Sequence, residues 1–322
     1  MSEVNLAPDF IDRAGDALHR VAGIFDLEHL PFLALAVVPV AIWLWIFFKH
    51  KRENRLLTFA IFAAGMLAVM PIFIFQHEIA RIERGLEGLV SHFILTTALT
   101  GLWVGFYEET AKMWIVKWTG KSFFRDIDDA IILSIVVALG FSFIENVLYF
   151  YSIWNNAGIE ESMRWFYVAF RSLGSMLLHV IASGIFGYYF GLAYFAKPVL
   201  IDELSQGKKF IFTKRLHQIL FMRSETVFRE EKILEGLLCA ATIHATFDFL
   251  MGMSQHFTNI GSSTAARLWL LLAVPFLVGG FFWLTYLLDK KENHKNYGHL
   301  CGKDECDLLE EEHDKIEAVA KV

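Results

Sequence analysis

The sequence predicts an all-α protein, a polytopic membrane bundle of about seven transmembrane helices. Of its 322 residues, 55% are hydrophobic and only 20% are charged, whereas ordinary globular chains are about 45–50% apolar and about 25% charged. Seven stretches also approach or exceed the roughly 20 apolar residues that cross about 30 Å of hydrocarbon. They are 31–48, 56–75, 89–118, 130–151, 165–195, 233–253 and 268–288.

The composition also excludes several classes of protein. The chain has 3 Cys and 6 Pro and a formal net charge of -6. A disulfide-rich scaffold, a collagen-like repeat and a disordered chain are therefore excluded. A nucleic-acid partner is not expected, because such proteins carry basic patches or an excess of basic residues. No oligomeric state is predicted.

Charge at the ends of the stretches orients the chain. Every second connection is rich in Lys and Arg, namely 49–55, 117–125, 196–232 and 290–303, and the alternate connections hold fewer basic residues. Cytoplasmic loops carry such an excess. The pattern predicts an extracytoplasmic N-terminus, seven crossings and a cytoplasmic C-terminus.

The stretches can be justified in order. The segment 1–30 is either an amphipathic helix on the outer membrane surface or a frayed terminus. The stretch 31–48 has no lysine-rich flank or cleavage site, so we interpret it as a spanning helix rather than a signal peptide. It opens a transmembrane domain at 31–288. The loop 196–232 is either an interfacial helix on anionic lipid or a solvated loop, and 289–322 is a polar cytoplasmic tail.

Two stretches carry signals of their own. We expect 89–118 to be one long helix, with Lys117 extending to the inner interface. The acidic run DIDDA at 126–130 precedes the fourth stretch, and we interpret it as a helix cap rather than a cation site. Cys239 is expected to be a packed helix residue.

Ionisable side chains lie inside four consecutive stretches. Charges in hydrocarbon are costly, so such residues mark candidate functional sites. Their expected depths spread over about two helical turns, which tilt can bring together. The alternative is a set of buried polar pairs that specify helix packing. The residues are Glu108, Glu109, Lys112, Glu145, Asn146, Arg171, His179, His244 and Asp248.

The spacings suit hydrolytic chemistry. Glu108 and Lys112 are four residues apart and share a helix face. His244 and Asp248 have the same spacing, which suits a carboxylate that orients a histidine. A water activated by a carboxylate, with histidines stabilising an oxyanion, is sufficient for peptide hydrolysis. Two histidines with carboxylates are equally suited to Zn²⁺ with an open water position.

Four motifs occur in order on these stretches: EETAK (108–112), FSFIEN (141–146), His179 and HATFD (244–248). Together they match EExxK, FxxxEN, a lone histidine and HxxxD. This set resembles the PrsW family of intramembrane proteases, which is related to the type II CAAX prenyl proteases. The resemblance covers about residues 90–255, which would be the catalytic core.

The resemblance implies a peptidase of a bacterial cell membrane whose substrate is a membrane protein. The namesake makes the first cut in an anti-sigma factor. Glu108 and Glu109 would be the essential pair, one of them acting as general base, and His179 and His244 would stabilise the oxyanion or bind metal. Glu145 and Asp248 would stand where the CAAX relatives have His and Asn, with Lys112, Asn146 and Arg171 in support.

The cofactor is either none or Zn²⁺. A metal-dependent enzyme would use His179, His244, Glu108 and Glu145. We favour the metal-free glutamate mechanism, because no HExxH-like helix is present. The tail offers a weaker second candidate for metal binding in its H-x-C-x4-C-x6-H pattern, formed by His299, Cys301, Cys306 and His313.

Two other functions use the same buried residues. The first is a proton- or cation-coupled transporter or sensor, because buried Glu and His also form proton relays. The chain shows no pair of repeated, Gly/Pro-broken helices of the kind many transporters have. The second is an inactive relative that binds a membrane partner.

Overall fold

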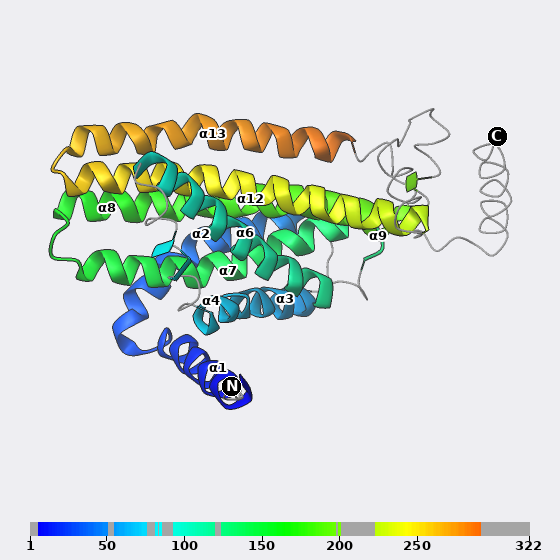
Figure 1. The fold of residues 1–322 in the computed structure, drawn as a ribbon, viewed down its shortest axis with the longest axis horizontal. Coiled ribbons are helices and arrows are strands. Elements are labelled where there is room, and N and C mark those ends of the chain that lie inside the picture. The colour runs from blue at the N-terminus through cyan, green and yellow to red at the C-terminus, as the bar shows by residue number, and fades with distance from the viewer. Residues whose placement is uncertain are drawn as a thin grey trace, which may run out of the picture.

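A computed structural model describes residues 6–50, 55–75, 81–82, 84–85, 93–119, 124–197, 199–200 and 223–290. The secondary structure in these ranges is helical, without a strand, which confirms the predicted all-α class (Figure 1). The elements are α1 (Leu6–Gly23), a 3₁₀ turn (Leu27–His29), α2 (Leu30–His50), α3 (Arg55–Leu67), α4 (Met70–Ile74), α6 (Phe93–Thr119), α7 (Ile127–Asn155), α8 (Glu161–Phe170), a π-helical turn (Arg171–Ser175), α9 (Met176–Tyr194), α12 (Ser224–Asn259) and α13 (Ser263–Lys290).

Six helical segments of the described chain are long and apolar enough to cross a membrane. α6 is not among them, although its 27 residues exceed the length that a crossing needs. Its four charged residues, Glu108, Glu109, Lys112 and Lys117, lower its apolar content. The seventh crossing and the orientation of the termini therefore stay predictions.

Three helix boundaries differ from the predicted ones. The second stretch divides into α3 and α4, and Pro71 occupies the first turn of α4, where its missing N–H is tolerated. The π-helical turn Arg171–Ser175 interrupts the fifth stretch between α8 and α9. The predicted loop 196–232 was wrong in its last part, because α12 already begins at Ser224.

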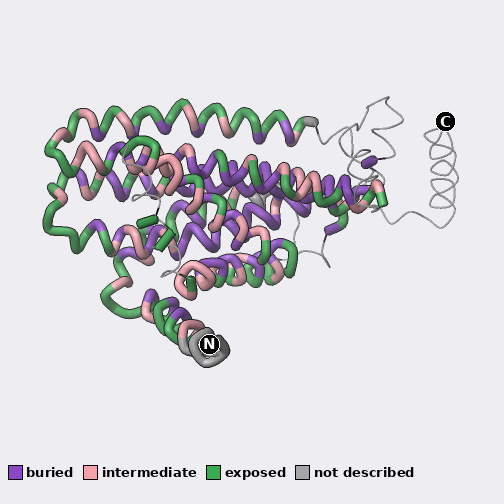
Figure 2. The backbone as a smooth tube through the Cα atoms, viewed as in Figure 1, coloured by how far each residue is buried: buried purple, intermediate pink, exposed green. Residues whose placement is uncertain are grey.

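The core of the bundle lies around α7 and α9, which pack on each other, while α12 packs on α6, α9 and α13. Small residues allow these close approaches, as is usual between membrane helices. A Cβ on Gly187 of α9 would lie 2.8 Å from the Ala130 carbonyl oxygen of α7, and one on Gly105 of α6 would lie 3.0 Å from that of Ala241. Buried residues therefore concentrate in the inner helices, and α13 is mostly exposed (Figure 2).

Local sequence signals predict the helix α1 and the start of α7. The predicted N-terminal amphipathic helix is confirmed as a helix, since α1 buries Ala17 and Val21 and packs on α4. The predicted acidic cap is also confirmed. The Asp126 side chain accepts a hydrogen bond from the Asp129 backbone N–H at 2.8 Å, and this fixes the start of α7.

Candidate functional site

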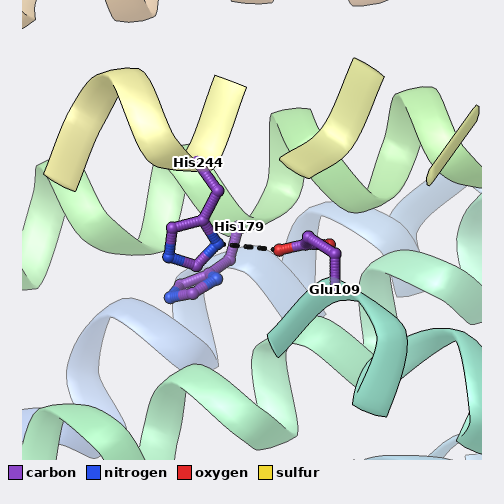
Figure 3. Close-up of side chains that lie close together, drawn as sticks. All are labelled: Glu109, His179 and His244. Carbon is purple, nitrogen blue, oxygen red and sulfur yellow. Dashed lines mark hydrogen bonds and ion pairs between the residues drawn. The ribbon is translucent and has the colours of Figure 1, made fainter. Parts of the chain in front are cut away.

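Three helices bring one residue each to a common centre. Glu109 of α6, His179 of α9 and His244 of α12 are all buried, and each offers one potential ligand atom within 4.8 Å of the other two. Figure 3 shows the two imidazole rings side by side, with the Glu109 carboxylate directed at His244. The expected convergence of distant ionisable residues is therefore seen in the structure for these three.

Glu109 is held by two donors. Its Oε1 accepts a hydrogen bond from Lys112 Nζ at 2.7 Å and another from His244 Nδ1 at 2.9 Å. Lys112 also lies 3.7 Å from Glu108 Oε2, so the predicted Glu108–Lys112 pair is present but is longer than the Glu109 contact. Glu109 is thus the better-anchored member of the adjacent pair.

The hydrogen bonds of His179 assign its tautomer. Lys112 Nζ lies 2.9 Å from His179 Nδ1, and an ammonium group can only donate, so Nδ1 is the acceptor. The proton of the neutral ring therefore sits on Nε2, which donates to Glu145 Oε2 at 2.9 Å. Arg171 forms an ion pair with the other oxygen of Glu145.

His244 connects this centre to two more carboxylates. Its Nε2 lies 3.4 Å from Glu108 Oε2 and 3.5 Å from Asp248 Oδ2, and the latter distance confirms the predicted His244–Asp248 pair. Glu108 Oε2 is buried and makes no hydrogen bond within the part of the chain that the structure describes. Glu108 thus retains a buried oxygen that can accept a proton.

A cavity of about 720 Å³ lies beside the central cluster, and its lining includes Glu108 but not Glu109, His179 or His244. Its charged lining consists of Glu108, Glu145, Arg171 and Asp248. From there it extends along α6 and α12 to Phe93 and Asn259, at one end of both helices. Polar groups such as Thr100 and Gln255 line the intervening part, so the cavity is suited to water and to a peptide backbone.

Not every predicted residue joins the site. Asn146 is fully buried, and neither atom of its amide has a hydrogen-bond partner within the described ranges. Phe141 was given no role from sequence, yet its ring lies 4.3 Å from Lys112 Nζ and 5.7 Å from the His179 ring. The sequence feature that could have indicated this is the position of Phe141 four residues before Glu145, which places both residues on one helix face.

The second candidate for metal binding falls elsewhere. His299, Cys301, Cys306 and His313 lie outside the described residues. Cys239 is a free cysteine, partly buried in α12.

The donor set of the central cluster fits a catalytic metal. Two histidines and one glutamate are a known ligand set for Zn²⁺ with an open water position. The carboxylate of this set is Glu109, whereas the sequence-based metal alternative used Glu108 and Glu145.

Comparisons with known proteins place the chain. The sequence model of the PrsW family, described as intramembrane metalloproteases, matches residues 53–204. A protein named Protease PrsW from Geobacillus kaustophilus (strain HTA426) is 31% identical over 169 residues, which are 51% of this chain and 67% of that protein. The chain belongs to the PrsW family. Membership identifies a multi-pass membrane peptidase and does not favour the transporter. No solved structure matches the chain.

The PrsW family match and the geometry complement each other. The matched range includes Glu108, Glu109, Glu145 and His179 but ends before α12. The fold then adds His244 and Asp248 to the same centre.

Proposed function

We propose that this PrsW-family protein is an intramembrane endopeptidase in which Glu108 is the general base that activates water. The observation that carries this proposal is the position of Glu108. Its carboxylate lines the cavity, and its buried Oε2 makes no hydrogen bond with the described residues. Glu109 is less suited to the task, because Lys112 and His244 both donate to it.

The other side chains orient or stabilise. His244 lies between Glu109 and the Glu108–Asp248 side, and its Nδ1–H bonds Glu109, so Nε2 of the neutral ring is an acceptor. Once Nε2 takes up a proton, the imidazolium can donate it to a developing oxyanion or to the leaving group. Glu145 holds the His179 ring through its Nε2–H. Arg171 supplies a buried positive charge at the cavity wall, which favours negative charge that develops on the substrate carbonyl.

A metal ion has a defined place in this proposal. Glu109, His179 and His244 would hold it. A bound Zn²⁺ would polarise the scissile carbonyl and acidify water. Proton transfer by Glu108 and the orientation of the histidines by their carboxylates are needed in either case.

The substrate in this proposal is a membrane protein cut close to the extracytoplasmic surface. The cavity extends toward the start of α6 and the end of α12, which face outward in the predicted orientation. The family resemblance implies a membrane-bound anti-sigma factor as this substrate. The protein would then act in a bacterial cell membrane.

The test compares membranes from cells that express the wild-type chain or Glu108→Gln. Labelling of protein N-termini should reveal cleaved membrane proteins in the wild type, with at least a 100-fold loss in the variant, as expected for removal of a general base. Thr246→Ala is the matched control, because this hydroxyl donates to the Thr242 carbonyl of the same helix. Equal cleavage by Glu108→Gln and wild type would refute the proposed role.

A further inference from the structure

A lysine lies within the cluster that could hold a metal. Lys112 is 2% exposed, and its ammonium nitrogen lies 2.7 Å from Glu109 Oε1 and 2.9 Å from His179 Nδ1. The ring of Phe141 lies 4.3 Å from the same nitrogen and adds a cation–π contact. The protein thus provides its own cation, desolvated and enclosed, between two of the three potential metal ligands.

The ammonium group and a metal ion would need the same electron pairs. Metal binding requires a lone pair on a ring nitrogen of each histidine. In His179, Lys112 donates to the lone pair of Nδ1, while Nε2 carries the proton that bonds Glu145. His179 therefore has no lone pair for a metal while Lys112 is in place, and Glu109 Oε1 already accepts from both Lys112 and His244.

We propose that Lys112 is the resident cation of the Glu109–His179–His244 cluster and competes with a divalent metal ion for Glu109 and His179. The ammonium neutralises a buried carboxylate that would otherwise be costly in hydrocarbon. A metal ion gains access only when the lysine side chain moves away. This competition is independent of the peptidase role, since it concerns occupancy of the cluster rather than catalysis.

The opposite role makes the opposite prediction. If Lys112 instead positions Glu109 and His179 for a metal ion, its removal should weaken metal binding. The sign of the change in metal affinity therefore distinguishes competition from support.

The experiment measures the Zn²⁺ affinity of the purified full-length chain in detergent, by competition with a chromophoric chelator. Lys112→Met and Lys112→Gln remove the charge, and each should bind one Zn²⁺ at least tenfold more tightly than the wild type. Adding His179→Ala to Lys112→Met should abolish that gain. Lys232→Met is the matched control, because Lys232 pairs with Glu235 in α12, and it should leave the affinity unchanged.

Thermal unfolding gives a second readout that requires no catalysis. A ligand that binds the folded state raises the unfolding temperature, so Zn²⁺ should stabilise the two Lys112 variants more than the wild type. Cooperative unfolding in the absence of Zn²⁺ would show that the variants are folded. Zn²⁺ affinity that is unchanged or lower in both folded variants would overturn the proposal.

Discussion

The helices α7 and α13 have nearly the same length and mean hydropathy but occupy opposite environments. In the most apolar 18-residue stretch of each helix, 83% of the residues are buried in α7 and 22% in α13. α7 lies inside the bundle, whereas α13 runs along its edge with a mostly exposed surface (Figures 1 and 2). Hydropathy thus identifies membrane helices without distinguishing a central helix from a lipid-facing one.

Polar residues account for the difference. α7 carries Ser134, Ser142, Glu145 and Asn146 within its apolar sequence, whereas the charged residues of α13 lie near its ends. A polar side chain in hydrocarbon must face protein partners. Helices with internal polar groups therefore pack inward, and α13 can meet lipid with most of its surface.

The largest expected effect comes from Glu145, the partly buried charge of α7 that pairs with the buried Arg171. Glu145→Ala leaves Arg171 without its ion-pair partner, which should cost about 3–5 kcal/mol of unfolding free energy. The measurement is unfolding in mixed detergent and SDS micelles, followed by circular dichroism.

The double variant Glu145→Ala/Arg171→Ala should recover part of this loss, because it removes both charges. Thr285→Ala on the exposed face of α13 should change stability by less than about 0.5 kcal/mol. Similar losses for Glu145→Ala and Thr285→Ala would contradict the contrast between the two helices.

An alanine substitution at one glycine in each helix tests their packing, and we expect an effect of intermediate size on stability. A Cβ at Gly140 of α7 would overlap the Phe62 carbonyl oxygen of α3, so Gly140→Ala forces the two backbones apart. Such overpacking costs about 1–3 kcal/mol. The same unfolding assay measures it.

Gly279→Ala is the control in α13, where an added Cβ meets nothing within 4 Å. This change should be neutral or stabilise the helix by up to about 1 kcal/mol. If Gly279→Ala were as harmful as Gly140→Ala, α13 could not be a loosely packed edge helix.

The smallest effect concerns the end of α7. Asp126→Ala removes the acceptor for the Asp129 N–H and should cost about 1 kcal/mol. Asp126→Asn keeps an acceptor oxygen and should retain most of the stability. A thermal unfolding series of the two variants checks this, and equal losses would show that the side-chain charge matters more than the cap.

The sequence predicted much of the fold because its signals are local. The number of consecutive apolar residues decides whether a segment can cross the membrane. The acidic run DIDDA likewise caps a helix whatever its tertiary surroundings are. The predicted residues Glu109, His179 and His244 also proved to share one centre. The division of the second stretch at Pro71 and the π-helical turn at Arg171 were missed, because both lie within apolar sequence that reads as continuous helix.

The sequence by itself determined that this is an all-helical membrane protein and which few ionisable residues lie in its helices, since the cost of burying charge makes such residues rare. Only the tertiary structure decided their partners. Lys112 lies closer to Glu109 and His179 than it does to Glu108. Of the two adjacent glutamates, Glu108 lines the cavity and Glu109 does not. Adjacent residues of a helix point about 100° apart, so the rotation of α6 against α9 and α12 sets these roles, and packing across the bundle fixes that rotation.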